Sequence, residues 1–124
     1  MHSDCLFCKI ARGELGTDLI LETENLVAFR DINPQAPTHI LIIPRQHIAS
    51  LNELEPAHGE IMGEVMLAVQ ALAKQEDLHQ GYRVVVNTGT HGGQSVAHLH
   101  FHLLGGRSLQ WPPELFAMSR NNDG

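Results

Sequence analysis

Cysteine is scarce in this 124-residue chain, which contains only Cys5 and Cys8. Two cysteines cannot form the several disulfide bridges on which small secreted scaffolds depend, so that class of protein is excluded. Apolar residues never run for the roughly 20 positions that a membrane-spanning helix needs, and the longest such stretch, residues 39–44, has the length of a strand. No secretory signal is visible before Cys8. We therefore expect a cytoplasmic protein with no membrane partner.

Basic residues are also few, because eight Lys and Arg stand against 14 Asp and Glu, for a net charge of −6. A protein that binds a nucleic-acid backbone needs a basic face, so a nucleic-acid partner is not expected. A small anionic ligand is still compatible with this charge, because a few local donors can hold one phosphate. Histidine is abundant instead: the chain has nine, and three of them lie within five consecutive positions.

The length suits one compact domain spanning residues 1–124, with no internal repeat and no linker. Helices are expected at residues 8–12, where Gly13 stops the helix, and from Leu51 to about Glu76, with Pro56 tolerated near the start. Strands are expected at residues 19–22, 26–30, 39–43, 82–87 and 98–104. This order predicts an α+β fold, in which a five-stranded antiparallel sheet packs with one long helix and a short N-terminal helix.

The last expected strand carries the three closely spaced histidines. Alternate side chains of a strand share a face, so His98, His100 and His102 should project to one side, while the intervening apolar residues pack against the long helix. Three imidazoles on one face are costly as mere packing, because each buried histidine needs hydrogen-bond partners. The pattern indicates a functional site. It fits either a bound metal ion, as in a metallohydrolase, or phosphate chemistry.

The segment before this strand favours phosphate. Residues 87–95 read Asn-Thr-Gly-Thr-His-Gly-Gly-Gln-Ser, a glycine-rich turn whose backbone amides could converge on an oxyanion, with polar side chains at Asn87, Gln94 and Ser95. A plain connection between two strands is the alternative interpretation.

Together these segments resemble the histidine triad (HIT) family. Residues 98–104 fit its His-φ-His-φ-His-φ-φ motif at every position, where φ is hydrophobic, and Gly-Gly-Gln-Ser-Val and Gly-Gly-Arg flank the motif as expected. The similarity extends over nearly the whole chain, including residues 28–39, 43–44 and 81–87. It is greatest to the nucleotide-binding, Hint-type branch.

The resemblance implies a homodimer in which the long helix and the fourth strand of each subunit join two sheets into one of ten strands. It implies hydrolysis of purine nucleoside 5'-phosphoramidates, in which AMP or GMP is linked to an amine or to lysine, with no cofactor required for catalysis. Two other functions stay open: a dinucleoside polyphosphate hydrolase, and a non-catalytic nucleotide-binding regulatory module.

Carried over by position, the resemblance makes His100 the nucleophile, with Asp31 on the ribose hydroxyls and Ile32 beside the purine. It places five residues on the phosphate: Asn87, Gly93, Gln94, Ser95 and His102. His98 and His39 complete the catalytic set. A neutral imidazole can attack phosphorus and form a nucleotidyl-histidine that water then cleaves. The leaving amine needs a proton, which Ser95 or a protonated histidine could supply.

Cys5-x-x-Cys8 alone is half of a tetrahedral zinc site. The resemblance implies that His47, within Pro44-Arg-Gln-His47, and His98 complete a structural zinc site; two reduced thiols are the alternative. Trp111-Pro-Pro113 resembles a family segment near the partner's site, and residues 114–124 are expected to form a flexible tail.

Overall fold

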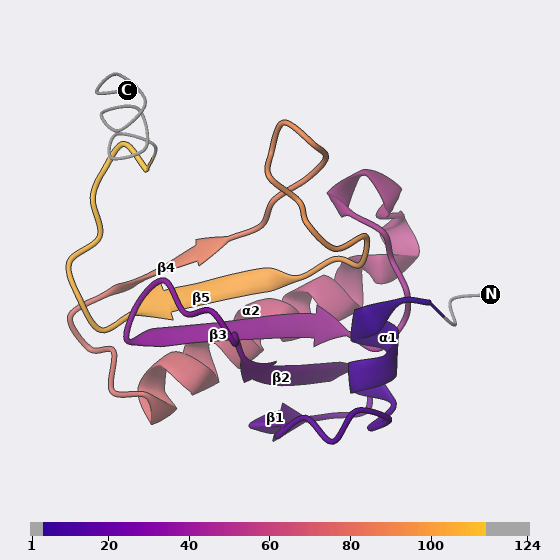
Figure 1. Ribbon diagram of the computed structural model, residues 1–124, viewed down its shortest axis with the longest axis horizontal. Coiled ribbons are helices and arrows are strands. Elements are labelled where there is room, and N and C mark those ends of the chain that lie inside the picture. Colours follow the sequence, from indigo (N-terminus) through magenta and orange to yellow (C-terminus); the bar gives the residue numbers. More distant parts are fainter. Residues whose placement is uncertain (1–3, 114–124) are drawn as a thin grey trace.

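The fold is described here from a computed structural model, which describes residues 4–113, so the expected tail at 114–124 lies outside the described residues. Seven helices and strands follow one another: α1 (Leu6–Ala11), β1 (Leu21–Glu22), β2 (Leu26–Arg30), β3 (Thr38–Pro44), α2 (Gly59–Gln75), β4 (Tyr82–Val85) and β5 (Phe101–Gly105). The strands form one antiparallel sheet in the order β1-β2-β3-β5-β4 (Figure 1). The expected α+β architecture is confirmed.

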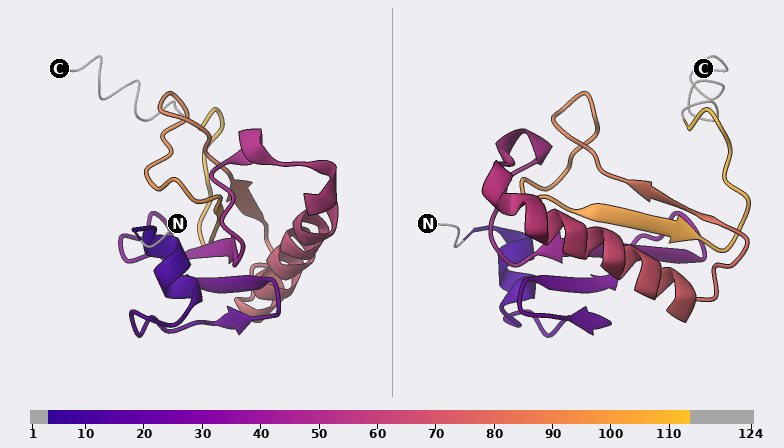
Figure 2. Two further views of the ribbon diagram at one scale, coloured as in Figure 1. Left: turned by 90° about the vertical axis from the view of Figure 1, so that its right-hand side faces the viewer. Right: turned by 180° about the vertical axis from the view of Figure 1, so that it is seen from behind.

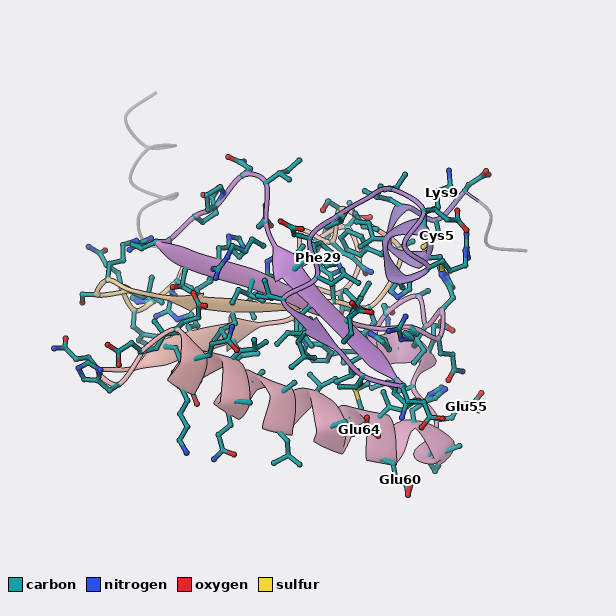
Figure 3. All side chains as sticks on the ribbon, turned by 90° about the horizontal axis from the view of Figure 1, so that it is seen from below. Cys5, Lys9, Phe29, Glu55, Glu60 and Glu64 are labelled. Carbon is teal, nitrogen blue, oxygen red and sulfur yellow. The ribbon has the colours of Figure 1, made fainter. Side chains whose placement is uncertain are left out.

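The two helices lie on opposite faces of the sheet (Figure 2). Strand β3 is buried along its whole length, and its side chains alternate between the two layers. Ile40 and Ile42 pack into the core beneath α2, whereas Leu41 and Ile43 pack into a second cluster beneath α1. Figure 3 shows the same separation, with Cys5 on the α1 side and Glu64 on the α2 side. The central strand is therefore covered on both faces.

Helix α2 begins at Gly59, later than the expected start at Leu51. Two short 3₁₀ turns, Leu51–Glu53 and Pro56–His58, take the place of the first turns. Pro56 has no N–H to continue a helical ladder, and the Glu55 N–H donates to the His58 Nδ1 at 3.0 Å, which closes the turn locally. The later stripe of Val65, Ala68, Val69, Leu72 and Ala73 is buried as the periodicity predicts.

Strand β5 begins at Phe101, not at the expected His98. The neighbouring strand β3 ends at Pro44, which has no N–H to donate to a ladder. The Leu99 N–H instead donates to the Ile48 carbonyl at 2.6 Å. The segment 98–100 therefore lies outside the sheet, so the prediction that His98 and His100 stand on a strand is wrong. Leu99, Phe101 and Leu103 still pack in the core with α2.

The outer strands are also shorter than expected. Strand β1 begins at Leu21 instead of residue 19, and β4 ends at Val85 instead of residue 87. Within the described residues, no helix is both long enough and apolar enough to cross a membrane.

Candidate active site and metal centre

Four histidines gather where β3 and β5 meet, on the α1 face of the sheet. His98, His100 and His39 are buried, and His102 is partly buried. The ring centre of His102 lies 5.1 Å from that of His100 and 5.1 Å from that of His39. The sequence-predicted catalytic histidines are thus brought together, although His98 and His100 precede the strand.

The hydrogen bond of His100 fixes which of its ring nitrogens carries the proton. Its Nδ1 lies 2.6 Å from the backbone carbonyl of His98. A carbonyl only accepts, so the Nδ1 carries the proton and the Nε2 of the neutral ring keeps its lone pair. The Phe7 ring meets this imidazole edge-on, with 5.0 Å between ring centres. His100 is therefore a buried, oriented imidazole with a basic nitrogen.

A second chain of hydrogen bonds sets the opposite tautomer at His102. The Gln35 backbone N–H donates to the His39 Nδ1 at 3.0 Å, which leaves the proton of the neutral ring on the His39 Nε2. That nitrogen lies 2.9 Å from the His102 Nδ1 and donates to it. The His102 proton is consequently on its Nε2, a buried atom with no hydrogen-bond partner among residues 4–113. His102 presents an unused donor.

Burial keeps the imidazoles of His102 and His39 neutral at pH 7. The pKa of His102 is lowered to about 4, first by burial and then by the positive charges that His100 and His39 would carry. Burial also lowers the pKa of His39, although the nearby Asp31 carboxylate opposes it. The donor at the His102 Nε2 is thus the N–H of a neutral imidazole.

Asp31 lies directly after β2, beside these rings. Its Oδ2 is 3.5 Å from the His39 Nε2, and its Oδ1 accepts from the Asn33 N–H at 2.8 Å. The next residue, Ile32, is a fully exposed apolar side chain. The structure therefore places the expected ribose-binding and base-binding residues next to the histidine cluster.

The loop between β4 and β5 closes on itself, because the Gln94 N–H donates to the Gly89 carbonyl at 3.0 Å. A Cβ at Gly92 would lie 2.3 Å from the Thr88 carbonyl oxygen, so the tight turn at the end of this loop requires glycine. The Gly92, Gly93 and Gln94 amides all donate within the loop. In this arrangement each of the three amides is used by a loop carbonyl, and the expectation that they converge on an oxyanion stays a prediction.

Gln94 holds this loop in place. Its Oε1 accepts from the Gly89 N–H at 2.9 Å, and its Nε2 donates to the Ala49 carbonyl at 2.7 Å and the Val96 carbonyl at 2.9 Å. Both ends of the side-chain amide are used. Ser95 is exposed and Asn87 is partly buried, and their roles, like that of Gly93, stay predictions.

Next to the triad, Cys5, Cys8, His47 and His98 form a tight cluster whose potential ligand atoms all lie within 4.8 Å of one another. The Sγ to Nδ1 distances are 3.2 Å for Cys5 and His98, 3.2 Å for Cys8 and His47, and 3.5 Å for Cys8 and His98. Tetrahedral zinc with ordinary bond lengths would separate S and N ligands by roughly 3.6 Å. Lengthening these three contacts by a few tenths of an ångström would bring them to that spacing.

The surroundings of this cluster suit a cation. Burial, followed by the neighbouring Cys5 thiol, raises the pKa of Cys8 to about 11, so a positive ion would be needed to hold it as a thiolate. The His98 Nε2 donates to the Pro44 carbonyl at 2.8 Å, which leaves its Nδ1 lone pair facing the thiols. The donor set and its orientation fit zinc.

The alternative in which His98, His100 and His102 share one catalytic ion does not match this geometry. Among the described residues, two clusters could hold a metal: the Cys/His cluster, and Asp31 with His39 and His102. Neither contains two histidines of the triad. His98 and His102 therefore belong to different clusters, and His100 belongs to neither.

Sequence reasoning missed two contributors to the site. Phe7 packs edge-on against both His98 and His100, and its place between the two cysteines was the available signal. The Gln35 backbone amide has no sequence signal, because every non-proline residue carries one. A separate cavity of about 580 Å³ at the ends of α2 and β4 is lined by none of the predicted site residues.

Comparisons with known proteins agree with this arrangement. The HIT domain family model matches residues 12–109. The chain is 50% identical to the 14 kDa zinc-binding protein of Zea mays, covering 90% of this chain and 88% of that protein. It is 43% identical to adenylylsulfatase HINT1 of Arabidopsis thaliana, covering 90% and 77%. A crystal structure of a HIT family hydrolase from Legionella pneumophila superposes with a TM-score of 0.86 at 50% identity, covering 88% and 98%.

Proposed function

This chain belongs to the HIT domain family, and we propose that it is a hydrolase of purine nucleoside 5'-phosphoramidates that acts through a nucleotidyl-histidine. The observation that carries the proposal is the bond from the His100 Nδ1 to the His98 carbonyl, because it leaves a buried, neutral Nε2 free to attack. The hydrolase names of the Legionella and Arabidopsis relatives support the reaction class.

In the first step, the lone pair of the His100 Nε2 attacks the α-phosphorus. The new N–P bond forms as the bond to the amine breaks, and the amine leaves with a proton that Ser95 is proposed to donate. Water then attacks the same phosphorus and gives one proton back to Ser95 as the N–P bond to His100 breaks, and the nucleoside monophosphate is released. Two displacements through one oriented imidazole replace a single, more difficult one.

In this scheme, His102 donates a hydrogen bond to the phosphoryl oxygens. Its Nε2–H is a buried donor without a hydrogen-bond partner among residues 4–113, and its ring is adjacent to the nucleophile. A preformed donor in a buried site stabilises developing negative charge more than a solvated one does. Asn87, Gly93 and Ser95 are proposed to complete the phosphate contacts.

The nucleoside would lie over the end of β2. The Asp31 carboxylate can accept both ribose hydroxyls, and the exposed Ile32 can cover one face of the purine. His39 holds the tautomer of His102, and Gln94 holds the loop that brings Ser95 to the site.

We propose zinc at Cys5, Cys8, His47 and His98, which the name of the maize relative supports. Zinc bound there would cross-link four side chains. Because neither the His100 Nε2 nor the His102 Nε2 belongs to this cluster, the chemistry itself needs no metal ligand from it.

The active unit is proposed to be a cytoplasmic homodimer of single-domain subunits, with no nucleic-acid partner. In the part of the chain that the structure describes, β4 is an edge strand that pairs with β5 alone. Exposed apolar side chains are Tyr82 in β4 and Met66 and Leu67 on α2. An interface formed by β4 and α2 of each subunit would cover these side chains and give the ten-stranded sheet.

The test is release of AMP from an adenosine 5'-phosphoramidate. We expect His100→Ala to reduce kcat/KM at least roughly a hundredfold, the scale of losing a covalent nucleophile. His79→Ala, at an exposed histidine, is the control and should match the unaltered protein. Full activity in His100→Ala would refute the mechanism.

Parallel assays separate the neighbouring functions. Adenylyl sulfate and a dinucleoside polyphosphate, supplied at the same concentration, test the leaving group. Preference for the polyphosphate would favour the alternative function, a dinucleoside polyphosphate hydrolase. Binding of AMP without turnover of any of the three compounds would favour a non-catalytic nucleotide-binding module.

A further inference from the structure

We infer that the Cys5-Cys8-His47-His98 cluster acts on the nucleophile, so that a metal bound there and a nucleotide bound at His100 strengthen each other's binding. The inference rests on the proposed function and adds a form of regulation to it. His98 and Phe7 are positioning residues in this account, since neither is proposed to touch substrate.

A single residue, His98, connects the two sites. Its side chain faces the thiols through the Nδ1, at 3.2 Å from the Cys5 Sγ and 3.5 Å from the Cys8 Sγ. Its backbone carbonyl oxygen accepts a hydrogen bond from the His100 Nδ1–H, with 2.6 Å between the oxygen and the nitrogen. A shift of the His98 side chain toward an ion therefore moves or fixes the very group that orients the nucleophile.

Phe7 makes a second connection from the same cluster. It lies between the two cysteines in α1 and is almost fully buried. Its ring centre is 6.1 Å from that of His98 and 5.0 Å from that of His100, and both contacts are edge-on. Anchoring Cys5 and Cys8 to one ion would fix this ring against the nucleophile.

The segment that bears His100 needs such anchoring, because it lies outside the sheet. Its backbone is joined to the segment that follows β3 by a hydrogen bond, which the Leu99 N–H donates to the Ile48 carbonyl. His47 and His98, two members of the cluster, directly precede the two residues of that bond. A metal held by both would close a link across the same junction.

Thermodynamic linkage makes the effect measurable from either site. If a metal favours the arrangement of His100 that binds a nucleotide, the nucleotide must raise metal affinity by the same factor. We expect a factor of roughly five or more, the lower end of typical couplings between sites.

The experiment measures zinc affinity of the full chain by competition with a chromophoric chelator, with and without saturating AMP. The free zinc is calibrated in both buffers, because AMP itself binds metals weakly. The inference expects at least roughly fivefold tighter zinc binding with AMP, and equally tighter AMP binding by the zinc-loaded protein in calorimetry.

Two variants test the route. His100→Ala leaves all four ligands in place and should abolish the effect of AMP on zinc affinity. Phe7→Leu also keeps the ligands and should reduce the effect. A spectroscopic readout independent of turnover is ¹⁵N NMR of the imidazoles, in which the His100 Nδ1–H tautomer should be better defined with zinc than after chelation. Circular dichroism checks that each sample is folded.

The outcomes are distinguishable. Equal zinc affinity with and without AMP, in a protein that binds AMP and cleaves the phosphoramidate, overturns the inference alone. An AMP effect that persists in His100→Ala also overturns it, because the coupling would then not pass through the nucleophile. Failure to bind AMP at all removes the proposed function together with the inference.

Discussion

At the scale of single residues, the site depends on backbone groups that decide where imidazole protons lie. The His98 carbonyl places the proton of His100 on Nδ1, and the Gln35 N–H, acting through His39, places that of His102 on Nε2. Adjacent histidines thereby present a lone pair and a donor, which are the two groups that attack on a phosphoryl centre requires.

The lowered pKa of His102 also predicts how stability depends on pH. Between its folded pKa of about 4 and its ordinary value of 6.5, the unfolded chain binds more protons than the folded one. The free energy of unfolding should therefore fall as the pH is lowered through this window. His102→Gln should show a shallower decline in urea unfolding at pH 7, 5.5 and 4.5.

The comparison is made on chelated samples, so that loss of metal in acid does not contribute. His79→Gln removes an exposed histidine and should follow the unaltered protein. Parallel curves for His102→Gln and the unaltered chain would show that His102 titrates normally in the folded state.

At the scale of elements, the closed loop between β4 and β5 is the feature most sensitive to a small change. Gly92→Ala would place a Cβ at 2.3 Å from the Thr88 carbonyl oxygen, so the backbone must shift. We expect at least a tenfold loss of kcat/KM, about the effect of moving a catalytic contact, and a lower melting temperature.

Gly63→Ala is the matched control, since a Cβ there meets nothing within 4 Å and the residue lies within α2. Alanine is favoured over glycine inside a helix by about 1 kcal/mol, so this variant should melt at the same or a higher temperature and keep its activity. Unchanged activity in Gly92→Ala would mean that the loop does not shape the site.

Sequence patterns predicted those elements whose signals are local. The hairpin around residues 23–25, the buried β3 and the stripe of α2 follow from periodicity and turn chemistry. The start of β5 was missed because it depends on where β3 ends, at Pro44, which is far away in the sequence. The start of α2 was missed because the helical spacing continues through the 3₁₀ turns.

The candidate site shows the same division. The identities of its histidines, cysteines and Asp31 were visible in the sequence, since each residue type has its own chemistry. The partition of the triad between the proposed zinc cluster and the proposed phosphate site depends on side-chain direction. The direction of each side chain depends on its backbone hydrogen-bond partner, such as the Pro44 carbonyl for His98. The residue type alone does not predict that partner.

At the scale of the whole molecule, the exposed edge of the sheet bears on assembly. Leu67 is 66% exposed on α2, the helix that the proposed dimer interface uses together with β4. A lysine there would have to be buried between subunits, so Leu67→Lys should shift the protein from dimer to monomer at micromolar concentration in sedimentation velocity.

Leu15→Lys is the control for this substitution. Leu15 is 50% exposed, but it follows α1 and is outside the β4 edge. Leu15→Lys should leave the dimer intact, because isolated surface substitutions usually have small effects. A monomeric unaltered protein, or a Leu67→Lys variant of unchanged mass, would contradict the proposed assembly.

The central claim is that His100 forms a bond to phosphorus. Rapid mixing with an adenosine 5'-phosphoramidate, quenching with alkaline denaturant after a single turnover time and intact-mass measurement test it directly, followed by peptide mapping of the modified residue at alkaline pH, because the N–P bond is labile in acid. We predict an adenylyl adduct on His100 that forms before AMP appears and is absent from His100→Ala. Single-turnover release of AMP with no adduct at any time, or an adduct mapped to another residue, would contradict the account.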